Sequence, residues 1–306
     1  MDSSPRPGYP SQSDHAEHAG HPAWQLTADL DEFHSRAAAF LHSAPALHTA
    51  LLSVTDMLRT RGLHVYGKED PLFGIRADGE GAVSGAFLWT PPHFPALSPL
   101  ADAAAADELA GVLADAGLAP AGIGAESATA GAFSAAWQRR TNATPVVHYP
   151  QRLYRLGTLT PPLPSPAGGA RVATGADREL LARWHGEFHE AIGEKAAMDA
   201  GEWADARIAY GGVTLWETPD GAPVAMAGNT RQVAGQVRIA PVYTPAHLRG
   251  RGYAGAVTTV VSRAALAAGA DEVLLFTDVD NPTSNELYQR LGFSPVRDFT
   301  QYGFTR

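Results

Sequence analysis

Two periods in the apolar and polar positions of the second half of the chain predict the order of its elements. Apolar residues spaced by three and four, such as Leu181, Trp184 and Phe188, are typical of a helix, whereas alternating or wholly apolar runs are typical of strands. The pattern predicts strands at 171–173, 213–218, 223–229, 236–243, 273–276 and 293–304, and helices at 177–192, 202–210, 253–268 and 283–291. We therefore expect an α/β (α+β) fold with the order β-α-α-β-β-β-α-β-α-β.

The first half repeats the end of this order more faintly. The pattern there predicts strands at 86–91, 121–126 and 146–156, and helices at 101–116 and 129–141. The first of these strands ends in Trp89-Thr90-Pro91, which resembles Tyr243-Thr244-Pro245 in the second half. This internal repeat predicts that the first half is a second copy of the same fold.

Two segments of low complexity divide the chain. Residues 158–169 hold four prolines and two glycines, a composition typical of an extended linker. The first 22 residues are rich in Pro, Ser, Gly and His, and they bury too little apolar surface to offset the entropy of ordering. We expect a disordered tail at 1–22, one domain at 23–157, the linker at 158–169 and a second domain at 170–306.

Composition and charge exclude several classes of function. The 306-residue chain has a formal net charge of −9 and no run rich in Lys or Arg, so we expect no nucleic-acid partner. It has no cysteine, which rules out disulfides, cysteine nucleophiles and thiolate metal sites. No apolar stretch approaches the ~20 residues of a membrane span, and the first 22 residues lack the apolar core of a secretory signal. We expect a cytoplasmic protein, a monomer or homodimer, with no metal and no membrane partner.

The sharpest local signal is Leu248-Arg-Gly-Arg-Gly-Tyr-Ala254, which lies between a predicted strand and a long predicted helix. Closely spaced glycines let several backbone N–H groups point the same way, and the start of a helix adds its positive end. Arg249 and Arg251 add positive charge nearby. Together these features predict a cradle for a pyrophosphate.

The same residues allow an alternative interpretation. Residues 250–255 fit G-x-G-x-x-G, the dinucleotide fingerprint, and Asp278 follows at about the distance expected of a ribose-binding acid. The fingerprint turn should directly follow its strand, whereas residues 245–248 intervene here. The remaining ~50 residues are also too few to complete a six-stranded parallel sheet. An NAD(P)-dependent oxidoreductase therefore stands as an alternative.

A second signal, Asn281-Pro-Thr-Ser-Asn-Glu-Leu-Tyr-Gln-Arg-Leu-Gly-Phe293, directly follows the apolar strand. Asn281, Ser284 and Tyr288 are spaced by three and four, so we expect them to share one helix face. Leu287 and Leu291 are expected to form the opposite, core-facing stripe. This would hold Tyr288 on the polar side near the carboxyl ends of the strands, where open α/β sheets bind ligands.

These two segments resemble the motifs of the GCN5-related N-acetyltransferase (GNAT) superfamily. Residues 249–254 match R/Q-x-x-G-x-G/A, and residues 281–293 are similar to N-x-x-S-x-x-L-Y-x-x-L-G-F, in the right order with a strand between them. The resemblance covers 170–306 and implies two tandem GNAT-like domains, each a central mixed, mostly antiparallel sheet flanked by helices. In the first half, residues 92–100 lack glycine where the Arg-Gly loop would stand, so we expect that copy to be degenerate and structural.

The resemblance implies a transferase that moves an acetyl group from acetyl-CoA, its cosubstrate, to a primary amine of a small molecule or short peptide. Acetyl-CoA would lie between the strand that ends at Thr244 and the strand that begins at Val273. Tyr288 would be the catalytic residue that gives a proton to the departing thiolate, since tyrosine ordinarily has a pKa near ~10. The implied cofactor-binding residues are Val242, Tyr243, Thr244, Arg249, Gly250, Arg251, Gly252, Tyr253, Ala254, Asn281 and Ser284.

The sequence leaves the acceptor amine and the general base open. Alkyl ammonium groups have a pKa of ~10.4, so a base or a water chain must remove a proton before the amine attacks. The candidates for the base are Glu187, Glu190, Glu217, His185, His189 and a water chain, with Asp278 and Asp280 available to meet a cationic acceptor. A non-catalytic acyl-CoA-binding module is a further alternative.

Overall fold

The computed structural model describes residues 23–194 and 196–305, so the tail expected at 1–22 lies outside the described residues. The elements of the first half are β1 (Ala23–Thr27), α1 (Leu30–Ser43), α2 (Thr49–Arg61), β2 (Leu72–Ala77), β3 (Val83–Trp89), β4 (Ala96–Leu97), α3 (Ala103–Asp115), β5 (Gly122–Glu126), α4 (Ser127–Thr141) and β6 (Thr144–Leu156). Those of the second half are β7 (Gly169–Val172), α5 (Arg178–Ile192), α6 (Ala200–Ile208), β8 (Val213–Glu217), β9 (Pro223–Asn229), β10 (Gln236–Tyr243), α7 (Tyr253–Ala267), β11 (Glu272–Asp278), α8 (Pro282–Arg290) and β12 (Phe293–Thr305).

Both halves have the same order of strands and helices, apart from two short 3₁₀ turns in the second half. The order predicted for the second half is confirmed, and β9 and β10 begin and end at the predicted residues. In the first half, the strands and helices predicted from residue 86 onward are present, whereas β1, α1, α2, β2 and β4 were not predicted.

The predicted alignment of the two halves is wrong by one strand. The segment Trp89-Thr90-Pro91 closes β3, whose counterpart by order is β9, and the counterpart of β10 is the two-residue strand β4. This strand has only two residues, so it cannot show an alternating pattern. It pairs with β5 at a single position, Ala96 opposite Gly124. The loop that corresponds to the Arg-Gly loop is therefore 98–102 rather than 92–100, and it also lacks glycine.

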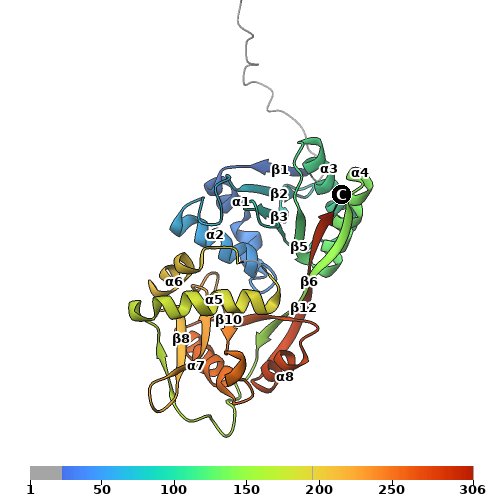
Figure 1. The fold of residues 1–306 in the computed structure, drawn as a ribbon. Coiled ribbons are helices and arrows are strands. Elements are labelled where there is room, and N and C mark those ends of the chain that lie inside the picture. Colours follow the sequence, from blue (N-terminus) through green and yellow to red (C-terminus); the bar gives the residue numbers. More distant parts are fainter. Residues whose placement is uncertain (1–22, 195, 306) are drawn as a thin grey trace, which may run out of the picture.

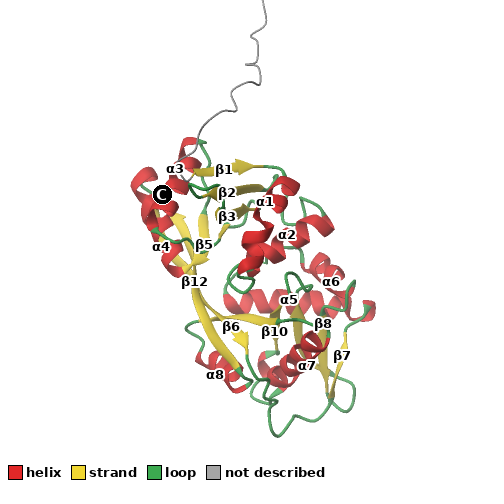
Figure 2. Cartoon of the chain, turned by 180° about the vertical axis from the view of Figure 1, so that it is seen from behind, coloured by secondary structure: helices red, strands yellow, loops and turns green. Residues whose placement is uncertain are grey.

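The strands form one twelve-stranded sheet with helices packed on its faces (Figures 1 and 2). Its order is β1-β2-β3-β4-β5-β12-β6-β11-β10-β9-β8-β7. Neighbouring strands are parallel in the pairs β4–β5 and β10–β11, and the other neighbouring pairs within the described residues are antiparallel. The sheet is therefore mixed and mostly antiparallel, as predicted.

The two halves exchange their last strands at the centre of this sheet. The strand β6 of the first half pairs with β11 of the second, from Arg155 opposite Leu274 to Gln151 opposite Asp278. The C-terminal strand β12 pairs in turn with β5 of the first half. The long strands β6 and β12 also pair with each other along their whole length. Neither half closes its own sheet, so the chain boundary at the linker is not a boundary between independent sheets.

Apolar cores lie on both faces of the second-half sheet. The side chains of Val237 and Ile239 on β10 pack with α7, whereas Tyr243 packs with the helix α5 and with Trp203 of α6. Ala46, which follows α1 of the first half, packs against Leu274 of β11. Figure 1 shows α2 of the first half beside α6 of the second, so the halves also meet through helices.

The linker passes along one end of the second half. Residues 158–168 contain no helix or strand, and β7 begins at Gly169. The N–H of Thr160 donates to the carbonyl of Leu291 at 2.9 Å, and the indole N–H of Trp216 donates to the carbonyl of Ala167 at 3.3 Å. These contacts bring Pro166 beside the loop that precedes α7.

Candidate functional site

The parallel strands β10 and β11 pair at one end and diverge at the other. Their pairing runs from Gln236 opposite Glu272 to Ile239 opposite Leu275. Beyond this point β10 continues to Tyr243 with β9 as its partner, and β11 continues to Asp278 with β6 as its partner. A register shift in β10 between Ile239 and Val242 accompanies the divergence. The β10 edge that faces β11 thus has no strand partner beyond Ile239 among the described residues, and an extended chain can pair with such an edge.

The Arg-Gly loop follows directly at the open end of this divergence. Gly250 and Gly252 have φ values of 77° and 84°, in the left-handed region that favours glycine, and α7 begins at Tyr253. The backbone N–H groups of residues 250–255 donate to no acceptor within the described residues. Consecutive free amides at a helix start form an anion site, because they add to the positive end of the helix.

The space beside the glycines fits a bound phosphate group. In the part of the chain that the structure describes, a Cβ added at Gly250 would meet nothing within 4 Å, and one at Gly252 would meet only Pro166 of the linker, at 3.8 Å. By contrast, a Cβ at Gly255 would lie 3.2 Å from the side chain of Leu287, so this third glycine serves the packing of α7 on α8. The loop therefore has the free donors and the open space that a pyrophosphate needs.

The two arginines of the loop lie at its surface. The Arg249 Nε donates to the carbonyl of Thr244 at 3.1 Å, and Arg251 donates to the carbonyl of His247 at 3.4 Å. Neither forms an ion pair with a carboxylate in the described residues. Of the other predicted cofactor residues, Thr244 is buried and its hydroxyl has no hydrogen-bond partner among the described residues, and Val242 packs toward α7.

The second motif forms α8 and the turn before it, with roles that differ from those expected. Asn281 caps the helix, because its Oδ1 accepts from the N–H of Ser284 at 3.0 Å. Asn285, which the sequence did not single out, is buried and connects five groups. Its Oδ1 accepts from the hydroxyls of Tyr154 and Thr277, at 3.0 and 2.6 Å, and its Nδ2 donates to three carbonyls of the turn, those of residues 278, 279 and 281. Asn285, Tyr288 and Leu291 are each three residues apart, and this spacing is the sequence signal that could have indicated the buried face of α8.

The expectation that Tyr288 lies on the polar side of its helix is wrong. Tyr288 is 8% exposed and belongs to the core that includes α7, with its ring packed edge-on against Phe293 at 6.0 Å. The spacing along this short helix lets Tyr288 share a face either with Asn281 and Ser284 or with Asn285 and Leu291. The structure buries the second of these faces. Burial raises the pKa of the Tyr288 hydroxyl, which makes no hydrogen bond within the described residues. A buried tyrosine hydroxyl usually has a hydrogen-bond partner. Because the described residues supply none for Tyr288, its hydroxyl is available to a ligand.

Of the base candidates, Glu187 lies beside the diverging strand. Its Oε2 accepts a hydrogen bond from the hydroxyl of Tyr243 at 2.7 Å. Burial and this contact raise the pKa of Tyr243 to about 12, so the phenol stays protonated and the carboxylate is the acceptor. Glu187 also lies 3.8 Å from Arg183, one turn earlier on α5.

The remaining candidates for the general base are exposed, ion-paired or buried against other side chains. Glu190 is exposed on α5, and Glu217 is ion-paired with Arg171 at 2.7 Å on the outer strands of the sheet. His185 is buried and stacked on Trp203 at 4.3 Å, and burial lowers its pKa to about 4. Asp278 accepts from the N–H of Asp280 at 2.8 Å in the turn after β11. Glu194, which the sequence did not single out, has a buried carboxylate oxygen with no hydrogen-bond partner in 23–194 and 196–305, and burial raises its pKa.

The described residues form neither a metal site nor a membrane-spanning helix. No cluster of three or more His, Cys, Asp or Glu side chains within 23–194 and 196–305 is arranged to hold a metal ion. In the same residues, no helix has the length and apolar character needed to cross a membrane.

Comparison with known proteins identifies the fold. Residues 178–293 match the acetyltransferase (GNAT) family model. The chain is similar to a GCN5-related N-acetyltransferase from Sphaerobacter thermophilus, with 18% identity, a TM-score of 0.58 and coverage of 91% of this chain and 94% of that chain. It is also similar to a GNAT-family acetyltransferase from Colwellia psychrerythraea, with 11% identity, a TM-score of 0.58 and coverage of 92% and 99%.

A third similar structure is a tandem GNAT protein from the clavulanic acid biosynthesis pathway, with 12% identity, a TM-score of 0.51 and coverage of 91% and 97%. No curated protein sequence matches the chain. Residues 178–293 therefore match the GNAT family model, and the chain has the fold of two GNAT-like domains in tandem, as the sequence predicted. The sheet is not the parallel sheet that the oxidoreductase alternative requires.

Proposed function

We propose that the protein is an acetyl-CoA-dependent N-acetyltransferase that acts on a primary amine of a small molecule or short peptide. The observation that carries this proposal is the row of free backbone N–H groups at 250–255, placed at the open end of the β10–β11 divergence in a GNAT domain. These amides, with Arg249 and Arg251, would hold the pyrophosphate of the cosubstrate. Val242, Tyr243 and Thr244 would hold its pantetheine arm along the free edge of β10.

Acetyl-CoA, when bound, supplies an acyl group activated as a thioester. The residues of this chain then have two tasks, because the attacking amine must lose a proton and the leaving thiolate must gain one. We propose Glu187 for the first task, since its carboxylate lies beside Tyr243 on the strand that would carry the arm. We propose Tyr288 for the second, since burial raises its pKa and keeps the hydroxyl protonated, and this hydroxyl has no hydrogen-bond partner among the described residues.

We assign Asn281 and Ser284 a positioning part in this site, because their capping contact fixes the start of α8. We also propose that the domain at 23–157 is catalytically silent, since its loop at 98–102 lacks the glycines of a phosphate cradle. Its part in the activity would be structural, because its strand β6 supports β11 beside the site.

The test is a screen of primary amines and short peptides with acetyl-CoA, in which release of free thiol is followed. We expect amine-dependent thiol release, together with acetyl-CoA binding and no NAD(H) binding by calorimetry. Acetyl-CoA binding with no thiol release from any amine would instead favour a non-catalytic acyl-CoA-binding module. Binding of NAD(H) without acetyl-CoA binding would favour an oxidoreductase.

A further inference from the structure

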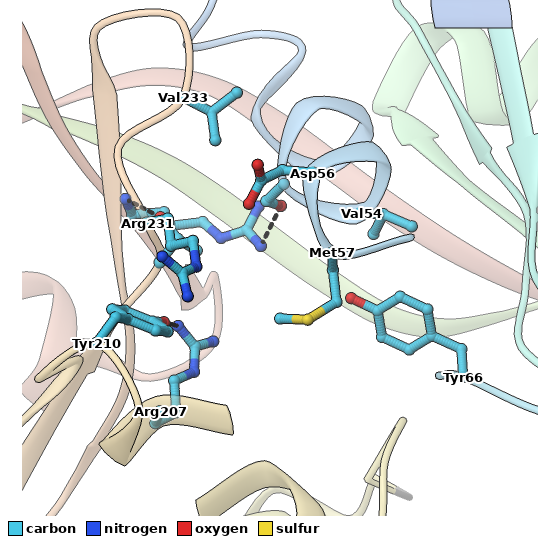
Figure 3. Close-up of a pocket in the computed structure, with 11 residues that line it drawn as sticks. Val54, Asp56, Met57, Tyr66, Arg207, Tyr210, Arg231 and Val233 are labelled. Atoms are coloured by element: carbon cyan, nitrogen blue, oxygen red, sulfur yellow. Dashed lines mark hydrogen bonds between the residues drawn. The ribbon is translucent and has the colours of Figure 1, made fainter. Parts of the chain in front are cut away.

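A small pocket lies where the two halves meet, outside the Arg-Gly loop. Its volume is about 60 Å³, several times the ~10–15 Å³ that one water molecule needs. Figure 3 shows Arg207, Tyr210 and Arg231 of the second half on one side of it, and Asp56 and Tyr66 of the first half on the other. Arg238 of β10 also lines it.

The pocket carries excess positive charge. Three arginines, Arg207, Arg231 and Arg238, line it with one carboxylate, Asp56, which gives a formal charge of 3 − 1 = +2 in a chain whose net charge is −9. None of the three arginines has a carboxylate within 4.0 Å in residues 23–194 and 196–305. Arginines brought together without counter-charge repel each other, and a bound anion would relieve this repulsion.

Within the described residues, Arg238 is held in place by neutral partners only. Its guanidinium donates to the hydroxyl of Ser53 at 2.9 Å and to that of Thr49 at 3.4 Å, both on α2 of the first half. A guanidinium has five N–H donors, so others remain for a ligand. Burial, with a smaller contribution from the nearby charge of Arg207, lowers the pKa of Arg238 to about 10, so it stays cationic at neutral pH.

The other two arginines are also fixed in position. Arg207 donates to the carbonyl of Asn229 and to the hydroxyl of Tyr210. The guanidinium of Arg231 stacks over the ring of Tyr210, 4.5 Å from its centroid. These contacts hold the guanidinium planes without neutralising them, which suits recognition of a planar or tetrahedral oxyanion.

The pocket adjoins the point where β10 and β11 separate. Arg238 precedes Ile239, the last residue of β10 that pairs with β11, and its guanidinium carbon lies 6.0 Å from the ring centroid of Phe276, the first residue of β11 beyond that pairing. Alternation along β10 directs Arg238 to the face opposite α7, where Val237 and Ile239 pack. The proposed pyrophosphate cradle follows the far end of β10. A thioester arm that extends from it along this strand would end a few residues from Arg238, at ~3.3 Å per residue.

We infer that this pocket binds an oxyanion of the acceptor, so that the acceptor is an amine that also bears a carboxylate or phosphate group a few bonds from its nitrogen. The inference rests on the proposed function for the identity of the acceptor. Binding of the oxyanion itself does not depend on it. The first half would then contribute to substrate choice, through the hydroxyls that hold Arg238 and through Asp56 and Tyr66.

The first experiment measures binding without acetyl-CoA. The melting temperature of the full chain is recorded in succinate, in phosphate and in chloride at matched ionic strength, and calorimetry gives the dissociation constants. We expect succinate, phosphate or both to raise the melting temperature above its value in chloride, because a ligand that binds the folded state stabilises it. The salt whose effect R238Q removes identifies a carboxylate or a phosphate, because phosphate could also bind the free amides at 250–255. Equal melting temperatures in all three salts would overturn the inference.

The second experiment compares acceptors in matched pairs, β-alanine with its amide and an aminoalkyl phosphate with the corresponding amino alcohol, by thiol release. We expect the anionic member of at least one pair to have a kcat/KM ~10–100-fold higher, the effect of one charge-assisted contact. The variants R238Q and R231Q should remove most of this preference, whereas R263Q, at an exposed position on α7, should keep it.

The outcomes separate this inference from the proposed function. Oxyanion binding that R238Q and R231Q abolish, with no thiol release from any amine, supports the pocket and contradicts the acetyltransferase. Thiol release with equal rates for both members of each pair supports the acetyltransferase and overturns the assignment of the pocket to the acceptor. Because Arg238 is largely enclosed, near-ultraviolet circular dichroism checks that R238Q is folded, and the exposed Arg231 provides an independent variant.

Discussion

The hydroxyl of Tyr154 donates a hydrogen bond to Oδ1 of Asn285, with 3.0 Å between the two oxygens, across 131 positions of sequence. Tyr154 lies on β6, the last strand of the first half, and Asn285 lies on α8, three residues before Tyr288. Asn285 also holds the turn after β11 through its hydrogen bonds to three carbonyls. The first half thus fastens the helix that carries the proposed proton donor.

Removing the hydroxyl of Tyr154 should weaken the whole fold. Y154F should lower the free energy of unfolding by about 1–2 kcal/mol, because the hydroxyl that donates to Asn285 and accepts from Nε2 of Gln289 is lost while Asn285 keeps the bond from Thr277. Urea unfolding measures this change. Y302F is the matched control, since the hydroxyl of Tyr302 has no hydrogen-bond partner in the described residues. A Y154F protein as stable as Y302F would contradict the role of this contact.

Filling the loop at Gly252 should abolish cofactor binding. G252V places a branched side chain at φ 84°, where the backbone is strained and the space for the phosphates is occupied. We expect calorimetry to detect no acetyl-CoA binding. G269V is the matched control, because Gly269 has φ 87° just beyond the other end of α7 and a Cβ there meets nothing within 4 Å. If both variants lose stability equally but G252V still binds acetyl-CoA, the cradle lies elsewhere.

Removing the hydroxyl of Tyr288 should slow the chemical step. Y288F keeps the ring against Phe293 and removes the proton, so kcat should fall by ~10²–10⁴ while the dissociation constant of acetyl-CoA hardly changes. The free energy of unfolding should also hardly change, since the hydroxyl has no protein partner in the described residues. Full turnover of Y288F across pH 6 to 9 would remove Tyr288 from the mechanism.

Glu187 should act on the acceptor rather than on the cofactor. E187Q keeps the size of the side chain and an acceptor for the Tyr243 hydroxyl but cannot take a proton, so kcat should fall by ~10²–10⁴ with unchanged acetyl-CoA binding. E179Q, at an exposed position in the first turn of the same helix, is the control. Equal activity of E187Q and E179Q would leave the proton transfer to Glu194 or to a water chain.

His185 should make the stability of the protein depend on pH. Burial lowers its folded pKa to about 4, whereas histidine in an unfolded chain has a pKa near ~6.5. Between these values the unfolded chain binds a proton that the folded chain does not, so the free energy of unfolding falls as pH is lowered through this range. The expected loss from this residue is roughly 3 kcal/mol at full effect.

Urea unfolding at pH 7.5 and pH 5 measures this dependence. H185F keeps a ring stacked on Trp203 and removes the titration, so its stability should fall less between the two pH values than that of the natural protein. Parallel losses in both proteins would show that other groups cause the pH dependence.

Local patterns were sufficient to determine the elements of the second half and the position of the loop. The period of apolar residues fixes β10 and α7, and the glycines at 250 and 252 are required where they stand because φ is positive at both. These properties depend on residues within a few positions of each other. For the same reason the sequence does not predict the two-residue strand β4, which shows no period. The predicted alignment of the two halves is therefore offset by one strand.

Only the tertiary structure decided which strands pair at the centre of the sheet, which face of α8 is buried and what lies between the halves. The sequence of β6 does not specify whether this strand pairs within its own half or with β11, because pairing is set by partners far along the chain. Tyr288 belongs to two possible faces of a short helix, and contact with α7 and Phe293 selects one. The arginines of the pocket lie at positions 207, 231 and 238 with no common spacing, and only the folded second half brings their charges together, beside α2 of the first half.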